Sequence, residues 1–327
     1  MSAAPRQAPP HPVLLEAPDI GVWQEGNTGV AYVHAFDGGQ AGPDVLLTAL
    51  VHGNEYAGAR VLCDLLALGF RPDRGRLTLA FGNVAAFQRF DRCRPDASRF
   101  VDEDMNRVWS PARLLGPESS AELLRARELL PFVERCTHLL DLHSMHEPAP
   151  PLLVTGPLAR DIRFAQALGC SGQVMVDEGH ADGVRMRDYE SGRRVSLLLE
   201  AGQHWDPQSE RVARDVTMRF LVSAGAIAPE RVIADWTLPA LRSLPAVHVT
   251  HRVVARSADF EFLGDWRGGE VIARAGTPIA RDGAQVIRTP YDECVLVMPS
   301  LRQLAPGVTT VRLGRMGTAP EGLATLS

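Results

Sequence analysis

His52 and Glu55 stand three positions apart at the junction of a predicted strand and a predicted helix. Residues 45–51 form a continuous apolar run, which is typical of a buried strand, and apolar side chains recur at helical spacing over residues 57–68. Both polar side chains therefore lie at the carboxyl end of a strand, where open α/β sheets bind their ligands. We expect Gly53 to let the chain turn sharply between them. An imidazole and a carboxylate from one turn can fill two neighbouring positions around Zn²⁺.

A catalytic zinc usually takes three protein ligands, and His143 is the candidate for the third. Residues 137–144 are typical of a second buried strand with a polar end, in which Asp141 and His143 point to the same face. His52, Glu55 and His143 would then bind one Zn²⁺ per chain and leave a position open for water. We expect Asp141 to support this group without binding the metal. A His-x-x-Glu pair alone is more often a surface or capping feature, so the prediction of zinc depends on the second strand end.

A long polar stretch at residues 82–117 brings further charged groups. Arg99 and Arg107 are fixed cations, and Asn106 can both donate and accept hydrogen bonds. Asp104 can accept the free ring N–H of a histidine ligand. An arginine fork is suited to a substrate carboxylate, and a second arginine can polarise a carbonyl on which negative charge develops. Loops of this length are often functional, although a charged run by itself is more often a solvated surface loop.

Glu200 ends another apolar strand at residues 195–200 and is followed by Gly202. A carboxylate in this place must face a cleft, pair with a cation or bind a metal. As a general base it would take a proton from water and later deliver it to the leaving amine. A salt-bridged glutamate at a strand end is the alternative. Several arginines near it in the sequence could reach a second substrate charge, and the sequence does not choose among them: Arg185, Arg187, Arg193 and Arg194.

Across residues 45–205 the sequence resembles the zinc carboxypeptidase superfamily, and within it the succinylglutamate desuccinylase/aspartoacylase branch. The motifs that carry the resemblance, in order, are His52-x-x-Glu55, Arg99, Asp104-x-Asn106-Arg107, Asp141-x-His143 and Glu200. The resemblance implies that His52, Glu55 and His143 bind Zn²⁺ and that Asp104 orients His52.

The resemblance also implies roles for the remaining residues of these motifs. Arg99 would polarise the amide carbonyl, Asn106 and Arg107 would grip a carboxylate, and Glu200 would be the general base. Aspartoacylases resemble one another near a late tyrosine that helps to bind substrate, and here Tyr291 lies close to that place but out of register. N-acetylaspartate and N-succinylglutamate are therefore candidate substrates and not predicted ones.

The elements that must position these side chains alternate along the chain. The strand-like runs are residues 30–36, 45–51, 77–81, 138–142 and 195–200, and the helix-like runs are residues 56–68, 118–133, 158–168 and 207–224. This alternation predicts an α/β fold with a mainly parallel sheet flanked by helices. The resemblance implies that this is the mixed sheet of the zinc carboxypeptidases. After about residue 235 only short β-rich runs remain, punctuated by glycine and proline, which predicts a smaller all-β domain.

We therefore divide the chain into a flexible tail (1–12), a zinc hydrolase domain (13–235) and a β-sandwich-like C-terminal domain (236–327). The C-terminal part resembles a biotinyl-carrier-like sandwich but has no Met-Lys-Met motif, so we expect it to cover the site and not to carry a cofactor.

Composition narrows the environment and the partners. With a net charge of −5, the chain is not expected to bind nucleic acid or anionic membranes. Its start lacks the apolar region of a signal peptide, and no run reaches the roughly 18 apolar residues of a membrane span. Five scattered cysteines without a Cys-x-x-Cys pair favour a cytoplasmic location. The sequence leaves open whether the chain forms a homo-oligomer.

These observations predict a zinc-dependent amidohydrolase that deacylates an N-acyl amino acid or a similar small carboxylate through a metal-activated water. One alternative is a metallocarboxypeptidase that acts on the C-terminus of a peptide. The other is a non-catalytic zinc- or ligand-binding homologue, against which the presence of Glu200 counts. The acyl group, the amino acid and the physiological metal are left open.

Overall fold

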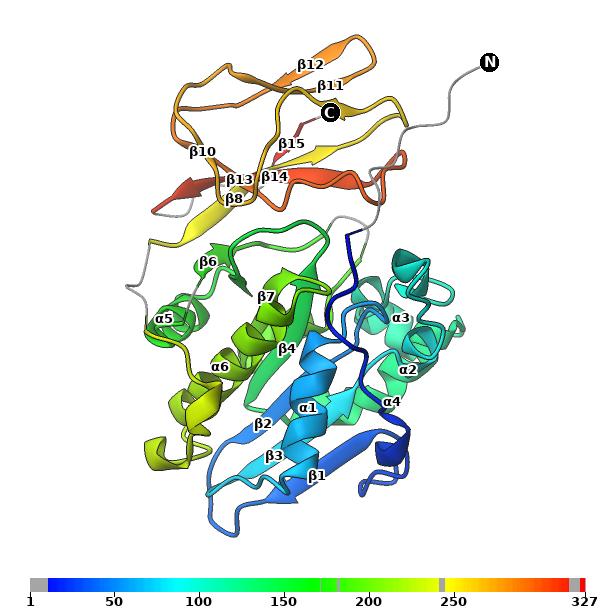
Figure 1. Ribbon diagram of the computed structural model, residues 1–327, viewed down its shortest axis with the longest axis vertical. Helices are drawn as coiled ribbons and strands as arrows, with labels where there is room; N and C mark the ends of the chain where they lie inside the picture. The colour runs from blue at the N-terminus through cyan, green and yellow to red at the C-terminus, as the bar shows by residue number, and fades with distance from the viewer. Residues whose placement is uncertain (1–10, 171, 181–182, 241–244, 318–323, 327) are drawn as a thin grey trace.

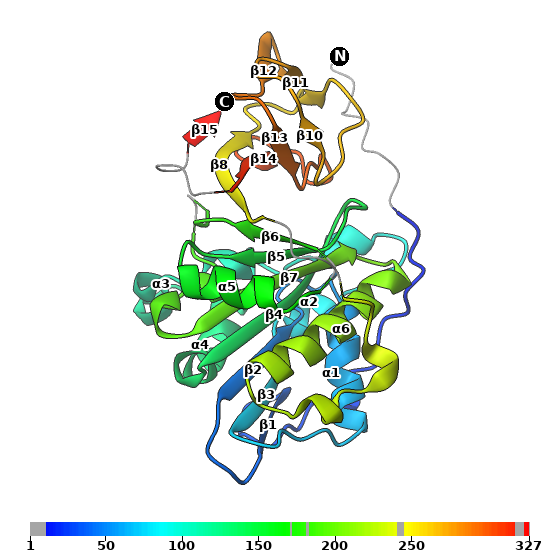
Figure 2. The ribbon, with the colours of Figure 1, turned by 90° about the vertical axis from the view of Figure 1, so that its left-hand side faces the viewer.

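The computed structural model shows the chain as one large twisted sheet with helices on both faces below and a β-rich region above (Figures 1 and 2). The residues that it describes are 11–170, 172–180, 183–240, 245–317 and 324–326. Most of the tail predicted at residues 1–12 lies outside them. Within the described residues, no helix is both long enough and apolar enough to cross a bilayer.

The lower part of the sheet has the strand order β1-β3-β2-β4-β7-β5-β6. Its strands are β1 (Val33–Asp37), β3 (Arg76–Phe81), β2 (Asp44–Ala49), β4 (His138–Met145), β7 (Val195–Gln203), β5 (Leu152–Thr155) and β6 (Gln173–Val176). Strands β3, β2, β4 and β7 run parallel, as do β5 and β6, whereas β1 is antiparallel to β3 and β5 is antiparallel to β7. The predicted α/β fold with a mainly parallel sheet is confirmed.

Helices cover the two faces of this sheet. The longer ones are α1 (Ala57–Ala67), α4 (Ala121–Arg135), α5 (Ala159–Ala167) and α6 (Pro207–Ser223). Helix α4 begins after Ser120, whose hydroxyl accepts a hydrogen bond from the Leu123 N–H and so caps the helix where the sequence indicated its start. Helices α1 and α6 pack on one face, while α4 packs on the other, which explains why the central strands are apolar on both sides.

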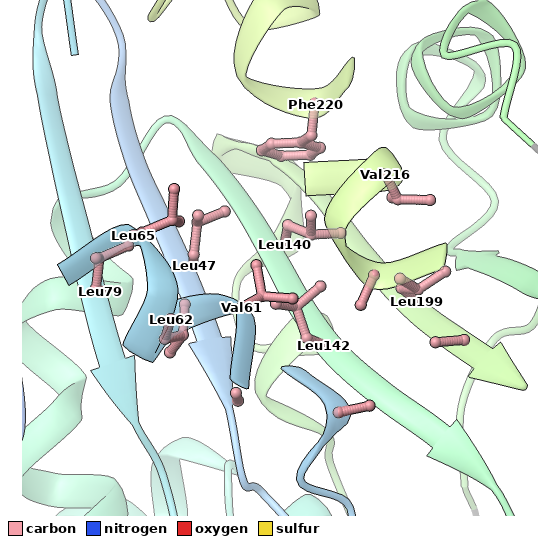
Figure 3. Packing of buried hydrophobic residues seen from close by; sticks show 14 of the residues in the cluster. Leu47, Val61, Leu62, Leu65, Leu79, Leu140, Leu142, Leu199, Val216 and Phe220 are labelled. Carbon is pink, nitrogen blue, oxygen red and sulfur yellow. The ribbon is translucent and has the colours of Figure 1, made fainter. Parts of the chain in front are cut away.

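The core between α1, α6 and the sheet is drawn in Figure 3. Leu47 of β2, Leu140 of β4 and Leu199 of β7 point to the same face and meet Leu62 of α1 and Phe220 of α6. All of these side chains are fully buried. This packing fixes α1 against the sheet, and α1 begins directly after the turn that holds His52 and Glu55.

Truncation of this core is expected to destabilise the protein measurably. Leu62→Ala should lower the free energy of unfolding by about 2–5 kcal/mol, because it removes buried methyl groups and leaves a cavity. Urea unfolding followed by circular dichroism measures this change. The matched control is Leu68→Ala at the end of the same helix, where the side chain is 62% exposed and little should change. Equal losses in the two variants would contradict the packing described.

The β-rich part extends the same sheet. Strand β8 (Val247–Val254) pairs with β6 in parallel, with Met175 opposite Val247, and the order continues β8-β14-β13-β10. The further strands of this part are β14 (Thr309–Met316), β13 (Cys294–Val297), β10 (Val271–Ile272) and β15 (Ala324–Leu326), the last of which pairs with β8. A separate small antiparallel sheet of order β12-β11-β9 packs above them, built from β12 (Gln285–Arg288), β11 (Pro278–Asp282) and β9 (Glu261–Phe262).

Two regions differ from the expectation. The stretch at residues 82–117 contains the short helices α2 (Val84–Phe87) and α3 (Pro111–Leu115), which are shorter than a periodic pattern needs to be visible. Strands β5 and β6 were not predicted, because each is a run of four residues and gives a weak signal. These two strands carry the sheet from the predicted site to the β-rich part.

Candidate active site

Three neighbouring parallel strands bring the predicted residues to one edge of the sheet. His52 and Glu55 lie in the turn between β2 and α1, and His143 and Glu200 lie near the ends of β4 and β7. His143 is the direct register partner of Glu200 on the adjacent strand. Because parallel strands end at the same edge, these side chains meet although up to 148 positions of sequence separate them.

Gly53 is required here for a reason other than the one expected from its flexibility. Its φ is not in the left-handed region. A Cβ on this residue would instead lie 2.5 Å from the backbone nitrogen of Phe87 and would also collide with the carbonyl oxygen of Ser98. The turn therefore packs directly against the backbone of residues 82–99, and this contact holds the long loop over the site.

The two histidines meet at the carboxylate of Glu55. Its Oε1 lies 2.8 Å from Nδ1 of His52 and its Oε2 lies 2.9 Å from Nδ1 of His143. All three side chains are buried, and their candidate ligand atoms lie within 4.8 Å of one another. Burial alone would raise the pKa of Glu55, but the charges of the two imidazoles outweigh it and hold this pKa well below its usual value. A proton or a metal cation stabilises such an arrangement.

The second nitrogen of each ring faces a carboxylate. Nε2 of His52 lies 3.0 Å from Oδ1 of Asp104, and Nε2 of His143 lies 2.8 Å from Oδ2 of Asp141. Asp141 is fully buried and its other oxygen accepts a hydrogen bond from the Thr48 hydroxyl at 2.7 Å. Nη2 of Arg99 also lies 2.9 Å from Nε2 of His52. In a metal-bound site, carboxylates in these places would favour the proton on Nε2 and leave Nδ1 of both rings to bind the metal. Asp104 and Asp141, which were predicted to support the metal ligands, thus each lie beside one ring nitrogen.

Asp141 offers a sharp test of this arrangement. Asp141→Asn should weaken zinc binding about 10- to 100-fold, because the amide no longer stabilises the Nε2 proton of His143 as a carboxylate does. Competition with a chromophoric zinc chelator measures the affinity. Thr48→Val, which removes only the hydrogen bond behind Asp141, should have a smaller effect of the same sign. Wild-type zinc affinity in Asp141→Asn would show that this contact does not orient the ring.

Arg99 lies against the same group. Its Nη1 donates to Oε1 of Glu55 at 3.0 Å and its Nη2 donates to Oδ2 of Asp104 at 3.1 Å. Burial would raise the pKa of Asp104, but the charges of His52 and Arg99 outweigh it and hold this pKa well below its usual value. Arg99 also lines the cavity, so a cation stands at the edge of the His-Glu-His group.

Asn106 and Arg107 reach the cavity from the same loop. Asn106 is buried, its Oδ1 accepts a hydrogen bond from the Met186 N–H at 3.2 Å, and its Nδ2 lies 3.4 Å from Nε2 of His143. Its amide therefore joins the loop to the segment around Met186. The guanidinium of Arg107 donates to the Asn106 carbonyl at 3.0 Å and lies 3.8 Å from Oδ2 of Asp104.

Glu200 faces the cavity beside the His-Glu-His group. It is 9% exposed, and its Oε2 is buried with no hydrogen-bond partner among the described residues. Burial, and next the charge of Glu55, raise the pKa of Glu200 to about 8, although the charges of His143 and Arg99 act against this rise. A carboxylate with a raised pKa and an unpaired oxygen in a cleft is suited to moving a proton.

The cavity has a volume of about 390 Å³ and contains every predicted site residue except Asp141. Among the arginines that the sequence left open, Arg185 lines it, whereas Arg187 and Arg194 are buried elsewhere and the side chain of Arg193 is 72% exposed. Sequence reasoning missed Arg312, which reaches the cavity from β14. Its only signal in the sequence was a charged residue between two apolar ones, Val311 and Leu313, in a β-rich run.

Comparisons with known proteins show which sequences and folds this chain is similar to. The family model described as the succinylglutamate desuccinylase/aspartoacylase catalytic domain matches residues 41–224. A succinylglutamate desuccinylase of Pseudomonas syringae is 33% identical over 108 residues, which cover 32% of this chain and 30% of that protein. This chain aligns with less than a third of the length of the curated relatives it matches.

Solved structures match over more of the chain. The crystal structure of succinylglutamate desuccinylase from Vibrio cholerae has a TM-score of 0.63 and 19% identity, covering 85% of this chain and 82% of that one. The structure of succinylglutamate desuccinylase/aspartoacylase from Rhodobacter sphaeroides also has a TM-score of 0.63 and 19% identity, covering 85% and 87%. At this level of identity the agreement shows that the folds are alike.

Proposed function

The chain belongs to the succinylglutamate desuccinylase/aspartoacylase family, and we propose that it is a zinc-dependent amidohydrolase that deacylates an N-acyl amino acid. The observation that carries this proposal is the position of Glu200. Its unpaired oxygen and the His-Glu-His group line one cavity. This combination is what hydrolysis by an activated water requires.

His52, Glu55 and His143 would hold one Zn²⁺ ion. Two imidazole nitrogens and a carboxylate form a ligand set that catalytic zinc sites use, and the remaining ring nitrogens already have carboxylate partners. When bound, the ion supplies a Lewis acid that acidifies water and polarises the carbonyl of the substrate.

Glu200 would move the proton in both halves of the reaction. As a carboxylate it takes a proton from the attacking water, and as a carboxylic acid it delivers that proton to the nitrogen of the scissile amide. A raised pKa helps the second step, because the protonated form is then accessible near neutral pH. Delivery of the proton lets the C–N bond break and releases a free amine and a carboxylate.

The arginines would bind and polarise the substrate. Arg99, at the edge of the metal ligands, is placed to stabilise negative charge on the carbonyl oxygen. Arg107, together with Asn106, would bind a carboxylate of the substrate at the cavity wall. The volume of about 390 Å³ supports a small substrate over a long peptide. The cysteines are free thiols, which supports the proposed cytoplasmic location.

The test is amine release by zinc-loaded protein from a panel of N-acetyl, N-formyl and N-succinyl amino acids. Release that requires the metal would establish the amidohydrolase and identify its substrate class. Dipeptides belong in the same panel, and hydrolysis of these alone would favour a carboxypeptidase. If no compound released an amine although each chain held one zinc ion, the proposal would be contradicted.

A further inference from the structure

Arg312 connects the β-rich part of the chain to the candidate active site. It lies on β14, and its guanidinium reaches the segment that follows β6. Its Nε is 3.3 Å from Oδ2 of Asp177, and its Nη2 is 3.4 Å from Nδ1 of His180. Arg312 lines the same cavity as Glu200, and only 11% of its side chain is exposed.

Positive charge exceeds negative charge around this segment. Asp177 and Asp188 supply the carboxylates that pair with guanidinium groups here, Asp161 also acts on Arg187, and Glu178 of the segment is exposed. Four guanidinium groups among the described residues contact either the segment at residues 177–180 or Asp188: Arg185, Arg187, Arg252 and Arg312. The single carboxylate of Asp177 pairs with two guanidinium groups, those of Arg185 and Arg312. A buried cluster with more cations than anions is costly unless an anion neutralises it.

The titration of neighbouring groups reflects the same excess. Burial, and then the charges of Arg312, Arg107 and Arg185, lower the pKa of His180, so this imidazole remains neutral. Burial also lowers the pKa of Arg312, and the charges of Arg185 and Arg107 act in the same direction, against the opposite effect of Asp177. Three arginines from separate segments therefore lie close enough to act on His180.

An apolar floor joins this place to the reaction centre. Leu198, two residues before Glu200 on β7, faces Val154 of β5, which in turn faces Met175 of β6, two residues before Asp177. Leu198, Val154 and Met175 all line the cavity and pack in one cluster. Neighbouring strands are spaced about 4.8 Å apart, so this floor spans roughly 10 Å from β7 to β6. Methylene groups of a substrate fit such a surface better than polar atoms do.

We propose that Arg312 is a specificity-determining residue that binds a carboxylate of the substrate, other than the one assigned to Asn106 and Arg107. Arg185 assists it, and the methylene groups next to that carboxylate lie on the floor formed by Leu198, Val154 and Met175. The proposal rests on the proposed deacylase function. The carboxylate can belong to the acyl group or to the side chain of the amino acid, and the chemistry of its recognition is the same.

A binding measurement tests Arg312 without any catalysis. Isothermal titration of the zinc-loaded protein with glutarate, and with butyrate as its monoanionic counterpart, gives the affinity for a second carboxylate. We expect Arg312→Met to weaken glutarate binding about 10- to 100-fold, the range of a lost charge-assisted hydrogen bond, and to leave butyrate unchanged. The conservative variant Arg312→Lys keeps the charge and should retain part of the affinity.

The matched control is Arg315→Met. Arg315 lies three residues after Arg312 on β14, is exposed and does not line the cavity, so its removal should leave glutarate binding nearly intact. Equal affinity for glutarate in wild type and Arg312→Met, including weak binding in both, would overturn the proposal. An equal loss in Arg315→Met and Arg312→Met would also overturn it, because the effect would then be a general one of charge or stability.

Kinetics with matched substrates distinguish the two sources of the carboxylate. N-succinyl-alanine carries it on the acyl group, N-acetyl-glutamate carries it on the amine half, and N-acetyl-alanine lacks it. Arg312→Met should raise KM for one dicarboxylate about 10- to 100-fold and leave N-acetyl-alanine within about threefold. Equal losses of activity on all three substrates, together with a lowered Tm, would show that Arg312 only stabilises the fold. Inactivity of the wild type on all three would contradict the proposed function, while the glutarate titration would still decide the role of Arg312.

Discussion

Glu200→Gln is expected to lower the kcat of amide hydrolysis by about 10²- to 10⁴-fold, the usual contribution of a positioned general base. Glutamine has nearly the same shape but cannot take a proton from water or deliver one to the leaving nitrogen. Because Glu200 is not one of the proposed ligands, the variant should still bind one zinc per chain. Steady-state kinetics with the best substrate of the panel, together with metal analysis of the same sample, measures both quantities.

Glu147→Gln is the matched control for Glu200→Gln. Glu147 also lines the cavity, but its carboxylate is held by Arg302 at 3.0 Å and by His11 at 2.7 Å. Its loss should change kcat by less than about tenfold, as for a charge that takes no part in the chemistry. Retention of most of the activity by Glu200→Gln would show that another group moves the proton.

The pH dependence has a definite sign. Glu200 accepts a proton only when ionised, so kcat/KM should fall as the pH drops through the pKa of its carboxyl group. Burial raises that pKa toward about 8, whereas a bound cation would lower it, so the acid limb should lie between the usual value of a glutamate and about 8. Glu200→Gln should lose this limb from its residual activity. A wild-type profile that stays flat to a pH below the usual pKa of a glutamate would contradict the assignment.

Loss of a metal ligand should have an equally large effect. His143→Ala is expected to remove stoichiometric zinc and to reduce activity at least about 10³-fold, because it leaves two ligands where a catalytic site needs three. Treatment of the wild type with a chelator such as dipicolinate should have the same result, reversed by added Zn²⁺. Inductively coupled plasma mass spectrometry and the amine-release assay measure the two effects.

His146→Ala is the control for this prediction. His146 lines the same cavity three residues further along, and its ring lies 3.3 Å from His204 and 3.5 Å from Asp96, away from the ligand set. This variant should keep its zinc. Stoichiometric zinc in His143→Ala, or activity that survives complete removal of the metal, would refute the zinc-dependent mechanism.

Several features of the site were predictable because they depend on local pattern. His52 and Glu55 share one turn, and each of the other two residues, His143 and Glu200, ends an apolar run. Parallel strands that alternate with helices must end at one edge of the sheet, so their terminal polar residues must meet. The fold class followed from the same alternation. Sequence could therefore predict that these groups lie together without knowing a single distance.

Other features depend on contacts between segments far apart in the chain. Asp104 and Asp141 each contact one ring nitrogen, and Asn106 accepts a hydrogen bond from Met186. These contacts depend on how a loop without periodicity folds over the strand ends. The reason for Gly53 also became visible only when the backbone of that loop was seen to pack against it. Spacing along the sequence does not determine such packing.

What the sequence determined by itself is which groups meet: the His-Glu-His group, the candidate base and the α/β sheet that brings them together. Only the tertiary structure decided which other charges line the cavity. It chose Arg185 among the nearby arginines and added Arg312, which lies 112 residues after Glu200. The physical reason is the pairing of β6 with β8, which continues the main sheet into the β-rich part. Strand pairing at such a distance is set by the packing of the whole molecule, and no local pattern records it.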